Sequence, residues 1–239
     1  MSGDAFNELT APGWIRQVEE ARKARRRLYP VTVVYTLLSI ATLALSLRPG
    51  RVAVPLVFYG LGFALWTWLE YEVHRHLLHG RFPDGPGAWQ HFLHRTFDHL
   101  HVEHHERPWD GNHINGTIRD TGPFLLPAFL LALALPPHTL LAFLAGLVQA
   151  YVAEEWVHHS VHYYHFDNLY FRYIKRHHLY HHSRRGREIA FGLTSGVWDV
   201  AHGTRIPADV RAALYGPLRA RRPHDSHPDR DNRLTPRLT

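Results

Sequence analysis

Residues 52–79 read VAVPLVFYGLGFALWTWLEYEVHRHLLH, an apolar run that passes directly into a cluster of histidines. The part from 52 to 69 carries no charge and has nearly the ~20 residues that a helix needs to cross a bilayer. Similar uncharged runs occupy 31–47, 122–137 and 139–153. The turn at 48–51 joins the first two runs, and a Pro-Pro-His hinge separates the last two. The sequence therefore predicts an all-α integral membrane protein with four transmembrane helices in two hairpins.

Basic residues indicate which way these spans face. Six precede the first span (Arg16, Arg22, Lys23, Arg25, Arg26 and Arg27), and six follow the fourth (Arg172, Lys175, Arg176, Arg184, Arg185 and Arg187). Lys and Arg are enriched on the cytosolic side of membrane spans, so we expect both termini in the cytosol. Four spans then put every histidine cluster on the same face, in a cytosolic helical cap.

The composition excludes several classes of protein. The chain of 239 residues has no cysteine, which excludes disulfides, iron–sulfur clusters and thiolate metal sites. Its net charge of +6 is typical of nucleic-acid binding, but the arginines flank apolar runs and form no continuous face. We therefore expect membrane lipids, and not nucleic acid, as partners. The 22 histidines are the most unusual feature of the chain.

Four histidine boxes carry the candidate chemistry. They are HRHLLH (His74, His76, His79), HVEHH (His101, His104, His105), HHSVH (His158, His159, His162) and HHLYHH (His177, His178, His181, His182). Positions i, i+3 and i+4 share one face of a helix, so the second and fourth boxes should each present three imidazoles to one point. In the third box, His158 and His162 should present two. His74 and His79 are about 140° apart on a regular helix, so they need either a helix that ends near Gly80 or one ligand for each of two metals.

Imidazole is a ligand for iron, zinc, copper and nickel. Ten imidazoles exceed what one ion accepts, so at least two metals are implied. Five per metal in octahedral geometry leave one open position on each, which oxygen activation requires. Zinc prefers four ligands, so we expect two Fe ions, with Zn as a possible occupant of a purified sample.

The spacing leaves some choices open. His76 or His159 can replace His74 or His158 in a helical pairing with the last histidine of the same box. Histidines outside the boxes are interpreted as interfacial anchors (His138, His202, His224 and His227) or as surface and ligand-supporting residues (His91, His94, His99, His113 and His165).

Between Glu70 and about Gly203 the chain resembles the fatty acid hydroxylase and sterol desaturase superfamily of membrane di-metal enzymes. The stretches EYEVHRHLLH, HVEHHERPWD, HHSVHYY and KRHHLYHHSRRGREIAFGLTSGVWD are most similar to the fatty acid 2-hydroxylase branch. FGLTSGVWD at 191–199 is the most specific part, because its spacing suggests no metal role and yet it matches that branch. The resemblance implies that ten histidines bind two metals: His74, His79, His101, His104, His105, His158, His162, His178, His181 and His182.

The chain departs from this branch in two places. The family pattern has Tyr-Asp before the third box, whereas this chain has Glu154 and Glu155. Glu155 still lies one turn before His158, so we expect it to support the ligands, and we expect Asp110 and Asp199 to orient ligand imidazoles. Many eukaryotic relatives also carry an N-terminal cytochrome b5 domain, but only about 30 residues precede the first span here. Electrons are therefore expected from a separate donor, such as a cytochrome b5 or a ferredoxin with its reductase.

The resemblance implies a membrane di-iron oxygenase that hydroxylates a lipid C–H bond, with 2-hydroxylation of a fatty acyl chain as the preferred reaction. Hydroxylation or desaturation of a sterol or carotenoid is the alternative within the superfamily. A metal-binding membrane protein or transporter is the alternative from another class, although transporters place polar ligands near the middle of their spans.

We expect three parts in the chain: a basic interfacial segment at 1–30, a hydroxylase-like membrane domain at 31–203 and a basic, largely disordered tail at 204–239. The excess of arginine over lysine favours a bacterial plasma membrane over the endoplasmic reticulum.

Overall fold

The computed structural model of the chain describes residues 11–135 and 139–215, and all regular structure within these ranges is helical. In chain order the helices are α1 (Ala11–Ser46), α2 (Ala53–Glu72), the π-helix η2 (Val73–Leu78), α3 (Ala88–Leu93), the π-helix η3 (His94–His99), α4 (Leu100–Glu106), α5 (Ile118–Ala134), α6 (Thr139–Tyr163), α7 (Leu169–His181), α8 (Val197–Ala201) and α9 (Ala208–Tyr215).

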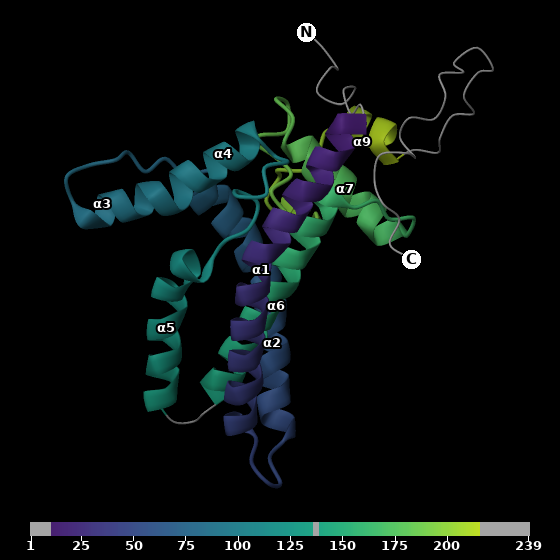
Figure 1. Cartoon of the computed structure of the whole chain (residues 1–239). Helices are drawn as coiled ribbons and strands as arrows, with labels where there is room; N and C mark the ends of the chain where they lie inside the picture. The colour runs from purple at the N-terminus through teal and green to yellow at the C-terminus, as the bar shows by residue number, and fades with distance from the viewer. Residues whose placement is uncertain (1–10, 136–138, 216–239) are drawn as a thin grey trace, which may run out of the picture.

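Three of these helices are long and apolar enough to cross a membrane, and they pack along one another in the centre of the molecule (Figure 1). The candidate spans are Arg16–Ser46, Ala53–Leu78 and Thr139–Tyr163. The fourth expected span, 122–137, corresponds to α5, which has 17 residues and contains Pro123 and Pro127. Within the described residues, the structure thus gives three candidate spans where the sequence predicted four.

A tight turn joins α1 and α2 at the place where the sequence predicted the first turn. The amide of Arg51 donates to the carbonyl of Arg48 at 3.0 Å, and Gly50 has a φ of 75°, a left-handed conformation that glycine adopts at little cost. The hinge predicted at 136–138, with His138, lies outside the described residues.

The basic segment before the first span does not form a separate surface helix. It is the first part of α1, which continues through Pro30 into the span as one helix of 36 residues (Figure 1). Its arginines therefore extend along the axis of the span, beyond the apolar part. The division of the chain at residues 30 and 203 stays a prediction.

Two glycines allow α2 and α6 to approach closely. A Cβ atom at Gly62 of α2 would overlap the carbonyl group of Phe143, and one at Gly146 of α6 would overlap the carbonyl group of Tyr59. The backbones of the two helices are therefore in contact, as small residues permit in membrane helix pairs. This contact sets the separation of the first and third histidine boxes, which follow on the same two helices.

All four histidine boxes lie at the end of the molecule opposite the α1–α2 turn, as predicted (Figure 1). α2 passes into η2, α6 ends beside it, and α4 and α7 cross this end. The first helical turn of α7 is capped by Asn168, whose side chain accepts a hydrogen bond from the amide of Phe171.

Part of the predicted disordered tail is helical. α9 packs on α7, where Arg176 donates to the carbonyl of Leu214 at 2.6 Å and the rings of Tyr173 and Tyr215 lie 5.3 Å apart. Residues 216–239, with His224 and His227, lie outside the described residues.

Candidate metal centre

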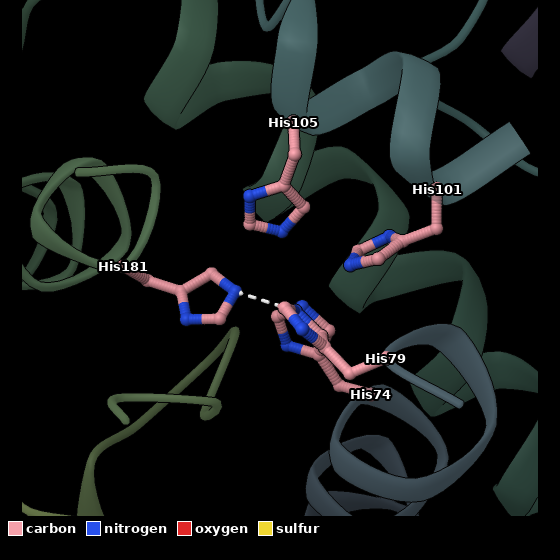
Figure 2. Close-up of side chains that lie close together, drawn as sticks. All are labelled: His74, His79, His101, His105 and His181. Atoms are coloured by element: carbon pink, nitrogen blue, oxygen red, sulfur yellow. Dashed lines mark hydrogen bonds between the residues drawn. The ribbon is translucent and has the colours of Figure 1, made fainter. Parts of the chain in front are cut away.

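The ten histidines that the resemblance selected come together as two groups of five. In each group, one nitrogen from every ring lies within 4.8 Å of the others, an arrangement that could hold a metal ion. Site A contains His74, His79, His101, His105 and His181, and site B contains His104, His158, His162, His178 and His182. Figure 2 shows the five rings of site A converging from three separate segments of the chain.

The two HxxHH boxes do not each present three imidazoles to one point, which corrects the sequence prediction. His101 and His105 belong to site A, but His104, between them, belongs to site B. On an α-helix, residues four apart differ by about 40° in direction, whereas residues i+3 and i+4 differ by about 100°. α7 has the reverse arrangement, because its i,i+4 pair belongs to site B and its i+3 histidine, His181, belongs to site A. Each box therefore contributes to both sites.

A π-helical turn brings His74 and His79 to the same site. The amide of His79 donates to the carbonyl of His74 at 3.1 Å, the i→i+5 pattern of a π-helix. Residues five apart then lie nearly in line, and the two ring centroids are 5.1 Å apart. The helix ends here, as the first of the two sequence alternatives expected, and both histidines fall in the same group of five. Gly80 allows this ending, because a Cβ there would come within 2.7 Å of the carbonyl oxygen of His76.

The ring nitrogens have the spacing of a coordination shell. Two metal–nitrogen bonds of about 2.1 Å at right angles put their nitrogens about 3.0 Å apart. The measured Nε2 separations are 3.0 Å for His79–His181, 3.1 Å for His104–His158, 2.8 Å for His162–His178 and 3.0 Å for His178–His182. Within the described part of the chain, Nε2 of His101 and of His105 is buried without a hydrogen-bond partner, which is costly unless an ion takes the lone pair. The residues present therefore fit a pair of transition-metal ions.

Burial keeps these imidazoles in the neutral form that binds metals. Desolvation, with added repulsion from neighbouring rings, lowers the pKa of His79 to about 3. Desolvation likewise lowers the pKa of His181 to about 4, and those of His101, His104 and His178 fall well below the usual value. Protons therefore do not compete for these nitrogens near neutral pH.

Two carbonyls of one loop, two residues apart, each orient one ring of site A. The Nδ1 atoms of His181 and His74 donate to the carbonyls of Ile189 and Phe191, at 2.8 and 2.5 Å. Ala190 lies between them with a φ of 61°, an unusual left-handed conformation for alanine. This conformation aims the two flanking carbonyls at different rings, and it leaves Nε2 of both rings for a metal.

Asp199 acts on this loop and not on a site histidine, contrary to the prediction that it orients a ligand imidazole. Its carboxylate accepts hydrogen bonds from the amides of Phe191 and Gly192, from the Thr204 hydroxyl and from the His177 ring. The FGLTSGVWD stretch thus gains a role that its spacing did not reveal. It ties the loop carbonyls in place, and α8 provides the carboxylate that does so.

Asp110 and Glu155 also bond to other groups than those predicted. Asp110 accepts from the His113 ring at 3.1 Å, and His113 lies in neither site. Glu155 accepts from the side chain of Asn115, the amide of Gly116 and the hydroxyl of Tyr151. Side chains at i and i+3 can diverge by about 60° on a helix, and Glu155 points away from His158 toward the 115–116 loop.

The open choices within the boxes resolve in the same direction as the resemblance. His76 is exposed, with its Nε2 atom 3.4 Å from a carboxylate oxygen of Glu72, and it belongs to neither site. His159 is buried among the rings of Trp156, Tyr163 and Tyr164 and also lies in neither site. That these ten histidines bind metal stays a prediction.

A cavity of about 360 Å³ adjoins both sites. His74 and His101 of site A, together with His104 and His158 of site B, are among the residues that line it. Its walls are mostly apolar and come from α2, η3, α4, α5 and α6, with Phe97, Leu125 and Val148 among them. The arrangement can hold an apolar molecule beside both candidate metal positions.

Two buried carboxylates in this cavity were not predicted from the sequence. Glu70 lies one turn before His74, and one of its oxygens accepts from the amide and hydroxyl of Thr194. Glu154 lies one turn before His158 and is 5% exposed. A Glu four residues before the first histidine of a box is the only sequence signal that they share.

Comparisons with known proteins agree with this geometry. The fatty acid hydroxylase family model matches residues 59–204, which include both sites. The dihydroceramide fatty acyl 2-hydroxylase FAH2 of Arabidopsis thaliana is 33% identical over 153 residues, or 64% of this chain and 61% of the relative. The fatty acid 2-hydroxylase of Mus musculus is 30% identical over 168 residues, or 66% of this chain and 42% of the relative. The chain thus spans about three fifths of the plant relative and less than half of the mouse one.

The fold is also similar to a solved structure. Full-length scs7p, of which only the hydroxylase domain is visible, matches with a TM-score of 0.62 and 25% identity over 75% of this chain and 67% of that chain. The family match covers more than half of the sequence and contains both histidine groups. The chain belongs to the fatty acid hydroxylase family.

Proposed function

We propose that this protein hydroxylates a lipid acyl chain, at the carbon next to the carbonyl, using dioxygen and two externally supplied electrons. Two five-imidazole groups meet at a single apolar cavity, and histidines of both groups line it, which is the main support for this function. The relatives named above, fatty acyl and fatty acid 2-hydroxylases, favour an acyl chain as the substrate.

The ten site histidines would hold two iron ions, which supply oxygen activation when bound. Five nitrogen ligands on each leave one position, and we infer that it faces the cavity. Zinc can take the same positions in a purified sample, because it binds nitrogen ligands more tightly than ferrous iron does.

The protein itself would position the acyl chain and exclude water from the cavity. The apolar walls of the cavity would exclude water and align the acyl chain with its reactive carbon beside His74 and His158. The carbonyls of Ile189 and Phe191 would keep the rings of site A in place, with Asp199 as a positioning residue. Glu155 and Asp110 would act in the same indirect way, through the 110–116 segment that borders the cavity.

We infer a multi-pass membrane protein with α5 as a fourth span and both termini in the cytosol. Leu126, Leu130 and Leu131 of α5 are 61%, 57% and 59% exposed, which suits a helix surrounded by lipid. Seventeen residues extend only about 26 Å, somewhat less than a hydrocarbon core of about 30 Å, so α5 needs its flanking residues or local thinning of the bilayer. The relatives come from plants, mammals and yeasts and so point away from the bacterial membrane that arginine usage favoured.

Lipid analysis of a host that lacks 2-hydroxylated lipids tests the proposal. Cells expressing the chain under ¹⁸O₂ should accumulate a fatty acyl species that carries one labelled oxygen, and fragmentation should put it on carbon 2. The His104→Ala variant should give no product, and the His76→Ala variant should match the unmodified chain. A labelled sterol or carotenoid in place of a labelled fatty acyl species would contradict the proposed acyl substrate. The absence of any labelled lipid, although the protein contains its metals, would refute the proposal that it is an oxygenase.

A further inference from the structure

The two histidine groups also have a side that does not line the cavity. Four site histidines line the cavity, whereas His79, His105 and His182 do not. These three are the only site rings that are partly exposed, since the other seven are buried. The two sites are therefore nearest to solvent at these three rings, which do not line the cavity.

A basic loop lies on this side of the sites. Residues 183–188 follow His182 directly, and Arg184, Arg185 and Arg187 in it are exposed. Glu188 is the only acidic residue of the loop. We call residues 183–188 the basic loop.

The basic loop is fixed to the site by short connections. The amide of Gly186 donates to the carbonyl of Ser183 at 3.0 Å, and a Cβ at Gly186 would overlap the carbonyl of Tyr180 on α7. Immediately after the loop, the carbonyl of Ile189 accepts the hydrogen bond from His181. A continuous path of covalent and hydrogen bonds thus leads from the exposed arginines to a ring of site A.

The proposed reaction needs electrons that the chain does not supply. Inserting one oxygen atom of O₂ into a C–H bond gives C–OH, and reducing the other atom to water takes two electrons and two protons. A one-electron carrier must therefore bind twice for each turnover and must approach the metals closely. In the proposed reaction the lipid chain would fill the cavity at that time, so the carrier would need another face.

We propose that the basic loop, with the adjoining edge of His79, His105 and His182, is the docking surface for an acidic, soluble one-electron carrier protein. The inference rests on the proposed function. Three exposed arginines against one glutamate give the loop a positive charge that attracts an acidic partner and speeds their encounter. The carrier would donate one electron in each encounter. The lipid would approach the sites from the cavity, so the two partners would not compete for one surface.

Charge reversal tests the surface without touching the site. Arg184→Glu/Arg185→Glu changes the loop, and Arg48→Glu/Arg51→Glu makes the same change in net charge at the α1–α2 turn, at the other end of the molecule (Figure 1). Each protein is placed in phosphatidylcholine nanodiscs, which removes anionic lipid as a competitor. The probe is the soluble haem domain of a cytochrome b5, and its binding is measured at low and at moderate ionic strength.

The loop variant should bind the haem domain about tenfold or more weakly at low salt and lose most of the salt dependence, because charge complementarity provides the attraction. The control variant and Arg184→Lys/Arg185→Lys should bind within about twofold of the unmodified protein. Unchanged metal content would show that the site is intact. Equal binding by the loop variant, or an equal loss in the control, would overturn the proposal.

Binding and product formation separate the two proposals. A protein that binds the carrier through the loop but forms no hydroxylated lipid would contradict the proposed function and support the docking surface. A protein that forms product at the normal rate after charge reversal, with unchanged carrier binding, would contradict the docking surface alone.

Discussion

At the scale of single residues, the assignment of neighbouring histidines to different sites is the most specific feature of the centre. His104 belongs to site B and His181 to site A, although each lies between histidines of the other site. His104→Ala and His181→Ala should each lower the iron bound per chain by roughly half, because each removes one of about five ligands from one ion only. Metal analysis of the purified variants measures this.

The matched control is His76→Ala, which removes an exposed histidine of the first box. It should leave metal content and product unchanged. Loss of all metal in either ligand variant would mean that the two sites depend on each other, and normal metal content would reject the assignment.

Ala190 is a second residue whose conformation can be tested. Its left-handed backbone aims the carbonyls of Ile189 and Phe191 at two rings of site A. Ala190→Gly should keep activity, since glycine adopts this conformation freely, whereas Ala190→Val should cost roughly 1–2 kcal/mol and lower metal content. Thermal unfolding and metal analysis compare the pair. Equal behaviour of the two variants would show that the strain has no bearing on the site.

At the scale of helices, the close contact of α2 with α6 fixes the distance between the first and third boxes. Gly62→Ala or Gly146→Ala would push the helices apart, at a cost of roughly 1–3 kcal/mol, and so weaken metal binding at both sites. Gly60→Ala is the control on the same helix, because nothing lies within 4 Å of a Cβ there. Titration with ferrous iron under anaerobic conditions should show weaker binding only in the first two variants. Equal affinity for iron in all three variants would show that metal binding does not depend on the contact between α2 and α6.

The sequence predicted helices better than it predicted how they meet. Apolar runs and the spacing of HxxHH are local features, so the boxes and most of the spans could be located from them. The π-helical turn at 73–78 could not, because the choice between α and π depends on what His74 and His79 contact. Nor does spacing within α4 and α7 reveal how these helices cross, and the crossing decides which histidine goes to which site.

The contacts of the acidic residues could not be predicted from the sequence either. Asp199 was expected to orient a site histidine, but the residues that do so are backbone carbonyls of a loop that Asp199 holds. A carbonyl has no sequence signature. The FGLTSGVWD match indicated that this stretch matters, and only the structure gives the reason.

At the scale of the whole molecule, the buried histidines make the metal-free protein sensitive to acid. Burial holds the pKa of His79 at about 3 and that of His181 at about 4, below the value of about 6.5 in an unfolded chain. Between these values the unfolded chain binds protons that the folded chain excludes. The free energy of unfolding contributed by these rings therefore falls as pH drops from about 6.5 to about 4, and it is constant above about pH 7.5.

Thermal unfolding of metal-free protein in detergent, at about pH 7.5 and about pH 5, measures this effect. The loss of stability on acidification should be smaller in His79→Gln/His181→Gln, which lacks the two rings. An equal loss in both proteins would mean that other groups control the acid sensitivity. Bound metal should raise the stability at both pH values, because it binds the folded chain.

We propose that ten imidazoles from four separate segments hold two metal ions beside one apolar cavity. Anomalous diffraction at the iron edge, from crystals of intact protein loaded anaerobically, would locate these ions. We expect two iron peaks, one inside each group of five rings. No peak, a single shared peak, or iron bound away from these rings would contradict it.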